Sequence, residues 1–165
     1  MSYLFTSESV SEGHPDKVSD QISDGILDNF LAFDPNSKVA CETLVTTGQV
    51  ILSGEVTSNT YIDVQEIARN VIKDIGYNND KYKFSGESCA VMSLIQEQSE
   101  DILRGIERSV KEEQGAGDQG IMFGYACNET ENSIPLTLDI ANRLLLELSK
   151  LRRSKEIPYL RPDSK

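Results

Sequence analysis

Apolar residues recur every three to four positions in two stretches of the first half of the chain. The first stripe follows Pro15 and consists of Val18, Ile22, Ile26 and Phe30, which is the spacing of an amphipathic helix. Pro15 suits the first helical turn, and Asp34-Pro35-Asn36 is expected to end the helix. The second stripe runs between Tyr61 and Ile75, and Gly76 is its expected C-terminal stop. The pattern predicts two amphipathic helices.

Between these two helices the pattern predicts a β-hairpin. Residues 38–45 and 49–57 are rich in Val, Ile, Leu and Thr, and they flank the sequence Thr46-Thr47-Gly48. Two β-prone segments on either side of a short turn containing glycine are typical of paired antiparallel strands.

Further along the chain the pattern predicts a buried strand at 88–95, another strand at 121–126 and a helix at 135–151. Residues 96–119 are dominated by charged residues, Gln and Gly, so we expect an active-site lid or a domain boundary there. Residues 156–165 are expected to be coil. This order of helices, hairpin and strands is typical of an α+β fold.

The charge of the chain narrows the classes of function. Lys and Arg number 16 against 27 Asp and Glu, which gives a net charge of −11 at pH 7. Such an acidic surface repels a nucleic-acid backbone and anionic lipid, so we expect neither nucleic-acid nor membrane binding. A nucleotide is still compatible with this charge, because a few well-placed cations or bound Mg²⁺ can reverse the local field.

Cysteine and histidine usage bears on compartment and metal chemistry. Cys41, Cys89 and Cys127 form no C-x-x-C pair, and their odd number argues against a secreted disulfide framework. His14 is the sole histidine, so the chain cannot build a His-rich metal site. The N-terminus does not resemble a signal peptide, and no apolar run is long enough to span a membrane. We therefore expect a cytoplasmic protein.

Residues 115–120 read GAGDQG and match the pattern G-x-G-x-x-G. A dinucleotide-binding fingerprint follows a strand and opens a helix, whereas here a charged segment precedes the glycines and a predicted strand follows them. We therefore reject a Rossmann site. The glycines indicate either a plain turn or a close approach of the backbone to another group.

The segment 11–17 places an imidazole, a carboxylate and an ammonium group at the start of the first predicted helix. A helix N-terminus favours anions. Asp16 could hold Mg²⁺, and His14 and Lys17 could donate to phosphate oxygens. The alternative interpretation is a polar helix start without a ligand.

Glu42 and Glu55 fall within the two hairpin strands among apolar neighbours. They share one face of the sheet if the connecting loop has an even number of residues. Two carboxylates on one face repel each other unless a cation lies near them, although both could instead point to water. Gln98, at the root of the predicted lid, could bind a carboxylate or could simply be a surface residue.

Taken together, several blocks of sequence strongly resemble the S-adenosylmethionine synthetase (methionine adenosyltransferase) family over essentially the whole chain. The most specific are GHPDK at 13–17 and GAGDQG at 115–120; further matches are VACET at 39–43, SGEVT at 53–57, CAV at 89–91 and PYLRPDSK at 158–165. The resemblance implies pseudo-symmetric α+β domains with a mixed or antiparallel sheet, helices packed on one face and a flexible lid loop from Gln98 to about Arg108.

The reaction implied by the resemblance is an adenosyl transfer. The sulfur of L-methionine attacks C5′ of ATP, the triphosphate leaves, and its hydrolysis releases diphosphate and phosphate. The family's cofactors are Mg²⁺ and K⁺. Its subunits face each other across flat sheets and share each site, so a homodimer or homotetramer is implied.

The resemblance also implies roles for individual residues. His14 and Lys165 would be catalytic, near the ribose 5′ oxygen and on the phosphates. Asp16 would bind Mg²⁺ and Glu42 would be the K⁺-associated carboxylate, while Glu55 and Gln98 would bind methionine. The ATP-binding set would be His14, Lys17, Asp118, Asp163, Ser164 and Lys165.

Family members are more than twice as long as this chain, so we expect it to correspond to their N-terminal portion. The expected division is an N-terminal domain at 1–101, a lid or linker at 102–117 and the start of a central domain at 118–165. Part of the substrate site would then be missing, and we expect the chain alone to be inactive. The alternatives are a non-catalytic homologue that docks on and regulates a full-length subunit, and a Mg²⁺-dependent nucleotide hydrolase.

Overall fold

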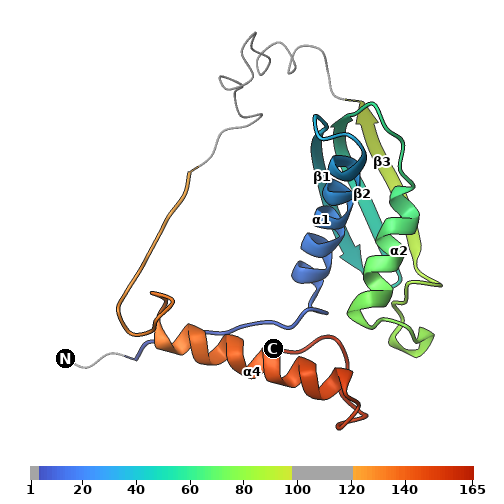
Figure 1. Cartoon of the computed structure of the whole chain (residues 1–165). Coiled ribbons are helices and arrows are strands. Elements are labelled where there is room, and N and C mark those ends of the chain that lie inside the picture. Colours follow the sequence, from blue (N-terminus) through green and yellow to red (C-terminus); the bar gives the residue numbers. More distant parts are fainter. Residues whose placement is uncertain (1–3, 98–120) are drawn as a thin grey trace.

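The computed structural model describes residues 4–97 and 121–165. A unit of helices packed on a three-stranded sheet comes first, followed by a long helix that lies beside it (Figure 1). The elements are α1 (Pro15–Phe33), β1 (Lys38–Thr46), β2 (Gln49–Thr57), α2 (Val64–Ile75), the short 3₁₀ helix η1 (Asp80–Tyr82), β3 (Ala90–Glu97) and α4 (Leu136–Arg153). The predicted α+β class is confirmed.

Helices α1 and α2 both begin where a side chain accepts hydrogen bonds from the first backbone amides. His14 caps α1, and its predicted stripe of Val18, Ile22, Ile26 and Phe30 is buried. The second helix begins at Val64, later than the apolar pattern predicts, because the Asp63 side chain accepts hydrogen bonds from the two amides that follow Val64. Gly76 ends α2 in the left-handed conformation with φ 115°, as expected for a C-terminal glycine.

The hairpin is confirmed, and a third strand joins it. Strands β1 and β2 are antiparallel and pair from Lys38 opposite Thr57 to Thr46 opposite Gln49. Strand β3 lies parallel to β2, so β2 is the central strand of a mixed sheet with the order β1-β2-β3. The parallel pairing requires a crossover, which α2 provides.

The hydrophobic core lies between one face of this sheet and helices α1 and α2. Val50 and Leu52 of the central strand are fully buried there, against Ile22, Ile26 and Ile72 of the helices. Strand β3 is not the buried strand that the sequence predicts. Met92 and Leu94 are 47% and 53% exposed, because helices cover only one face of the sheet and β3 is an edge strand.

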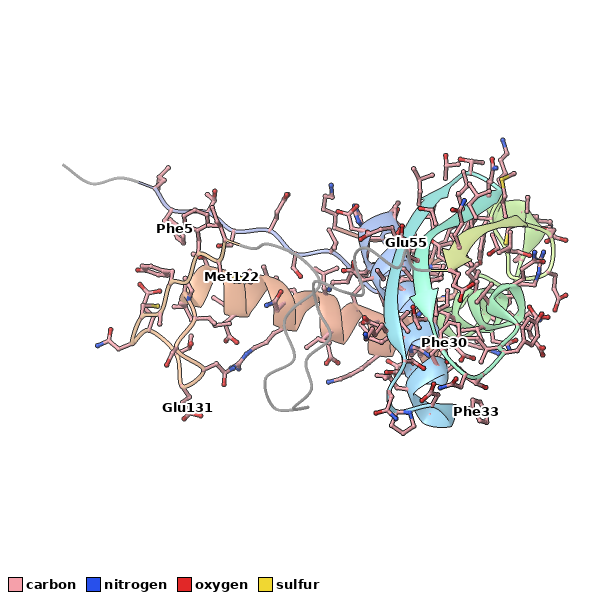
Figure 2. All side chains as sticks on the ribbon, turned by 90° about the horizontal axis from the view of Figure 1, so that it is seen from above. Phe5, Phe30, Phe33, Glu55, Met122 and Glu131 are labelled. Carbon is pink, nitrogen blue, oxygen red and sulfur yellow. The ribbon has the colours of Figure 1, made fainter. Side chains whose placement is uncertain are left out.

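The predicted strand at 121–126 is wrong, since these residues adopt no regular structure. A strand needs a hydrogen-bonding neighbour, and no strand among the described residues pairs with this segment. Phe123 is 95% exposed. Figure 2 shows Met122 and Glu131 at the end of α4 that is farthest from the sheet. In the described part of the chain, no helix is long and apolar enough to cross a membrane.

Candidate functional site

Two segments that are about 150 residues apart in sequence pair through their backbones. The amide of Ser11 donates to the carbonyl of Ser164 at 2.9 Å, and the amide of Gly13 donates to the carbonyl of Pro162 at 3.1 Å. The Ser11 hydroxyl donates to the Pro162 carbonyl at 2.6 Å and accepts from the Ser164 amide at 2.7 Å. The two segments therefore pair in antiparallel orientation. We call residues 11–13 and 162–164 the paired segments.

Gly13 is required for this pairing. A Cβ atom at this position would overlap the backbone of Pro162. The carbonyl of Gly13 is held from the other side, because the Tyr77 hydroxyl donates to it at 2.6 Å. The pairing places the GHPDK block next to the DSK sequence at 163–165, so the structure brings two of the sequence-predicted groups of site residues together.

His14 occupies the N-cap of α1 immediately after the paired segments. Its carbonyl accepts from the Val18 amide at 2.9 Å, and its ring Nδ1 accepts from the Asp16 amide at 3.3 Å. Because Nδ1 accepts, the proton of the neutral ring lies on Nε2. The His14 side chain is 18% exposed. Nε2 is therefore the ring atom that can donate to a ligand.

Asp16 and Lys17 lie in the first turn of α1 in different environments. The Asp16 side chain is 86% exposed, with one carboxylate oxygen 3.7 Å from Nδ1 of His14. The Lys17 ammonium donates to the Val10 carbonyl at 2.8 Å. Lys17 thus holds the segment that leads into α1, and only its remaining N–H donors could bind a phosphate.

Asp163, Ser164 and Lys165 lie at the other side of the pairing. Ser164 is fixed by its backbone bonds to Ser11. Asp163 lies within electrostatic reach of Tyr77: burial, and after it the Asp163 charge, raise the pKa of the Tyr77 hydroxyl to about 12. Tyr77 is therefore a neutral hydrogen-bond donor to Gly13 over the physiological pH range. Asp163 and Lys165 are both exposed.

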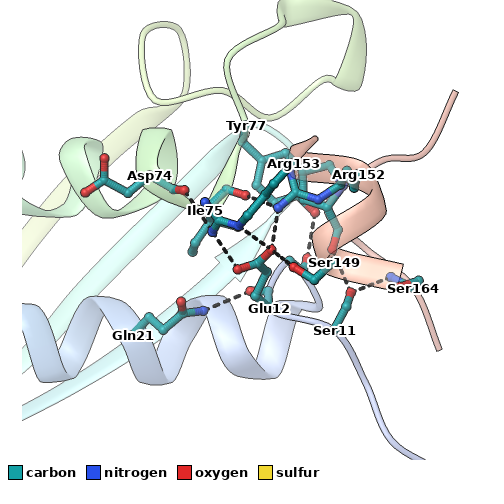
Figure 3. A network of polar contacts seen from close by, with 12 residues as sticks. Ser11, Glu12, Gln21, Asp74, Ile75, Tyr77, Ser149, Arg152, Arg153 and Ser164 are labelled. Atoms are coloured by element: carbon teal, nitrogen blue, oxygen red, sulfur yellow. Dashed lines mark hydrogen bonds and ion pairs between the residues drawn. The ribbon is translucent and has the colours of Figure 1, made fainter. Parts of the chain in front are cut away.

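A cluster of charged residues that the sequence analysis did not assign lies behind the pairing. We call Glu12, Ser149, Arg152 and Arg153 the Glu12 cluster (Figure 3). The Glu12 carboxylate accepts from the Ser149 hydroxyl and the Arg152 guanidinium. Arg153 binds both of its oxygens, at 3.2 Å through Nε and 2.6 Å through a terminal nitrogen. Burial alone would raise the pKa of Glu12, but hydrogen bonds from Arg153, Ser149 and Arg152 outweigh it and lower the pKa to about 2.

The Glu12 cluster also reaches the carboxyl end of α2. Arg152 donates to the Ile75 carbonyl at 2.8 Å, and Arg153 donates to the Asp74 carbonyl at 3.3 Å. Gly76 makes room, because a Cβ atom there would overlap the Arg152 guanidinium. Two adjacent arginines late in a helix were the available sequence signal, but a carboxylate partner 140 residues away leaves no trace in a local pattern.

Glu42 and Glu55 lie elsewhere, on the sheet face that α1 and α2 do not cover. Glu42 of β1 lies opposite Ser53 of β2, and Glu55 follows Ser53 by two residues along β2. The two-residue turn at Thr47 and Gly48 gives the even loop that the same-face prediction requires. Glu42 is exposed and Glu55 is partly buried. No group of three or more His, Cys, Asp or Glu within residues 4–97 and 121–165 is arranged to hold a metal ion.

Two of the sequence-predicted site residues, Gln98 and Asp118, lie outside the described residues. The same holds for the predicted lid from Gln98 to about Arg108 and for the GAGDQG block at 115–120. Their roles therefore stay predictions.

Comparison with known proteins gives two family-model matches. Residues 2–100 match the N-terminal domain of S-adenosylmethionine synthetase, and residues 113–165 match its central domain. The chain is 74% identical over its whole length to the S-adenosylmethionine synthase of Christiangramia forsetii, 69% to that of Flavobacterium johnsoniae and 68% to that of Cytophaga hutchinsonii. It spans 40% of the length of each of these relatives.

Proposed function

This chain belongs to the S-adenosylmethionine synthetase family, and on that premise we propose that it carries residues for adenosyl transfer from ATP to L-methionine. The reaction forms S-adenosylmethionine, and hydrolysis of the displaced triphosphate releases phosphate and diphosphate. The observation that carries the proposal is the pairing of residues 11–13 with 162–164. It places the start of α1 beside the DSK sequence, and these are the two segments to which we assign ATP.

The proposed chemistry needs positioning and charge neutralisation rather than a covalent intermediate. Attack of sulfur on C5′ requires the sulfur, the carbon and the leaving oxygen to be in line. Negative charge grows on the 5′ oxygen as the carbon–oxygen bond breaks, and donors aimed at that atom lower the barrier. We assign this donation to Nε2 of His14. Lys165, with Lys17, Asp163 and Ser164, would hold the triphosphate, and Asp118 would help to position the ATP.

The residues present fit the proposed cations. Mg²⁺ in nucleotide sites is commonly held by one or two carboxylates together with substrate phosphates and water. The Asp16 carboxylate is highly exposed at the start of α1, so it can take that role. For K⁺ the proposed ligand is Glu42, which shares its sheet face with the Ser53 hydroxyl opposite it. Bound cations would neutralise charge on the triphosphate.

We also propose that a second copy of the chain covers the exposed face of the sheet. We call this the open sheet face; its residues include Glu42, Leu44, Glu55, Met92 and Leu94. Leu44, Met92 and Leu94 are each about half exposed. Glu55, which we assign with Gln98 to methionine, lies on this face, whereas α1 packs on the other. A site that uses both Glu55 and the residues at the start of α1 is therefore easier to complete between two subunits than within one.

The test uses a chimera in which this chain replaces the matching 166-residue part of the Christiangramia forsetii synthase. The purified chimera is incubated with ATP, L-methionine, Mg²⁺ and K⁺, and the product is measured by chromatography. We expect S-adenosylmethionine from the chimera and none from the 165-residue chain alone. A folded but inactive chimera would contradict the proposal. Altered turnover of the intact synthase upon addition of the separate chain would favour the regulatory alternative.

A further inference from the structure

The Glu12 cluster has no place in the chemistry assigned so far, although it contains a carboxylate with four polar contacts from one helix. We propose that Glu12 is a positioning residue, which fixes the paired segments in register by binding Arg152 and Arg153 and so aligns His14 with Lys165. The alignment of these two residues with ATP rests on the proposed function. The register itself does not.

The first support is the position of Glu12 within the pairing. Its neighbours Ser11 and Gly13 both donate backbone hydrogen bonds to residues 162–164. The side chain of Glu12 points instead to the C-terminal end of α4, where two nitrogens of Arg153 bind its carboxylate. One residue therefore joins the first paired segment to the helix that leads into the second.

The second support is that polar contacts dominate where α4 ends. Leu144 and Leu146 are each 63% exposed, and Leu148 and Leu151, which lie nearer the end, are only partly buried, so apolar burial alone does not fix this end of the helix. By contrast, Arg152 is largely buried, at 13% exposure, between Glu12 and the Ile75 carbonyl. The depressed pKa of Glu12 agrees with a carboxylate that stays charged in this setting. Removing the charge would weaken the attachment of α4 to the segment that leads into α1, and the two arginines would keep only their contacts with the Ile75 and Asp74 carbonyls of α2.

The third support is that the predicted catalytic residues, His14 and Lys165, lie within two residues of the paired segments in sequence. His14 follows Glu12 by two residues and Lys165 follows Ser164 directly. A small shift of one paired segment against the other would move both side chains relative to any substrate. Misplacement of about 1 Å can cost on the order of 10²-fold in rate. The effect should fall on kcat more than on KM for ATP, because the same donors would still reach the triphosphate.

The inference is tested first on the 165-residue chain, by hydrogen exchange with mass spectrometry. Glu12→Gln keeps the shape of the side chain and removes its charge. We expect exchange at residues 11–14 and 162–165 to become at least tenfold faster, with no change around Val50 and Leu52 in the core. The matched control is Glu147→Gln, which removes the carboxylate of the exposed Lys150–Glu147 pair on the same helix. Unchanged exchange in the paired segments, or equal acceleration in the core, would overturn the inference.

The second test is kinetic and uses the chimera. Glu12→Gln should lower kcat roughly tenfold to a hundredfold, with KM for ATP within about threefold of the parent, and Glu12→Asp should restore part of the loss. A rise in KM alone would assign Glu12 to substrate binding and overturn the positioning role. The exchange result stands whether or not the parent chimera is active, so failure of the proposed function and failure of this inference are distinguishable.

Discussion

At the scale of single residues, His14 combines a structural and a proposed chemical role in one side chain. Its Nδ1 accepts from the Asp16 amide and caps α1. That bond leaves Nε2 as the donor of the neutral ring. Substitutions at His14 must therefore separate loss of the cap from loss of the donor.

His14→Ala in the chimera should lower kcat by on the order of 10²–10³-fold, since one donor to the leaving oxygen is lost. KM for ATP should change far less, because the other donors still hold the triphosphate. The measurement is single-turnover formation of S-adenosylmethionine, beside hydrolysis of added triphosphate. His14→Asn is the matched control, because it restores a good N-cap without the imidazole. If both half-reactions fall equally, His14 binds phosphate and is not catalytic.

Asp16→Asn should raise the Mg²⁺ concentration needed for half-maximal activity and leave KM for methionine nearly unchanged. The amide keeps the shape and one oxygen but loses the charge that a hard divalent cation prefers. Mg²⁺ is titrated into the chimera at saturating ATP and methionine. Asp20→Asn, one turn further along α1 and also exposed, serves as the control. An unshifted midpoint would leave Asp16 as a helix-start residue only.

The pH dependence of stability should contain a contribution from Glu12. Its folded-state pKa of about 2 lies below the ordinary value of 4.5, so the charged form is stabilised by folding. That contribution is fully present above about pH 4.5 and is lost as the pH falls towards 2. Urea unfolding of the chain and of Glu12→Gln should therefore differ most near pH 6, and the difference should shrink below pH 4.5 and close only near pH 2. A difference that is constant over this range would contradict the assignment.

At the scale of elements, the sequence predicted what depends on local periodicity. The stripe from Val18 to Phe30 and the segments flanking Thr46-Thr47-Gly48 became α1 and the hairpin. What failed depended on neighbours in space. The apolar run that includes Met92 and Leu94 suggests a buried strand, but these two side chains are about half exposed. The segment around Phe123 has the composition of a strand, but no strand among the described residues pairs with it. The contact of Glu12 with Arg152 and Arg153 is likewise set by the fold and not by spacing.

Within strand β2, Gly54 is a position at which glycine is required. Gly54 has φ 137°, and a Cβ atom there would overlap the Ala40 carbonyl of the facing strand. Gly54→Ala should lower the free energy of unfolding by roughly 1–3 kcal/mol or more, from backbone strain. Gly124→Ala, where a Cβ atom meets open space, should have little effect. Chemical denaturation followed by circular dichroism makes the comparison, and equal stabilities of the two variants would contradict the predicted strain.

At the scale of the whole molecule, the sheet separates the proposed site residues into two groups. His14, Asp16 and residues 163–165 lie around the start of α1, whereas Glu42 and Glu55 lie on the open sheet face. From the sequence, a shared face for the two glutamates depended on an even loop between the strands, and the two-residue turn in the structure meets that condition. The sequence could not predict that α1 packs on the other face, which depends on the whole core. The domain boundaries and the cytoplasmic location stay predictions.

Leu94→Asp should weaken self-association of the chain. The substitution places a charge among Leu44 and Met92 on the open sheet face, where a second copy would have to bury it. Light scattering over a range of concentrations should show a dimer for the parent chain and a monomer for the variant. Leu144→Asp changes a similarly exposed leucine on α4 and should leave the dimer intact. A parent chain that is monomeric at all concentrations would contradict the proposed interface.

The pairing of Ser11 with Ser164 also sets the order in which these parts of the chain can come together. These residues are 153 positions apart. During synthesis from the N-terminus, α1, the three strands and α2 leave the ribosome well before Ser164, and they can form their common core early. Closing so long a loop costs only modestly more entropy than closing a shorter one, but contacts between distant residues form slowly. The nascent chain therefore carries His14 in a folded unit before residues 162–164 have emerged, and the paired segments can meet only after that.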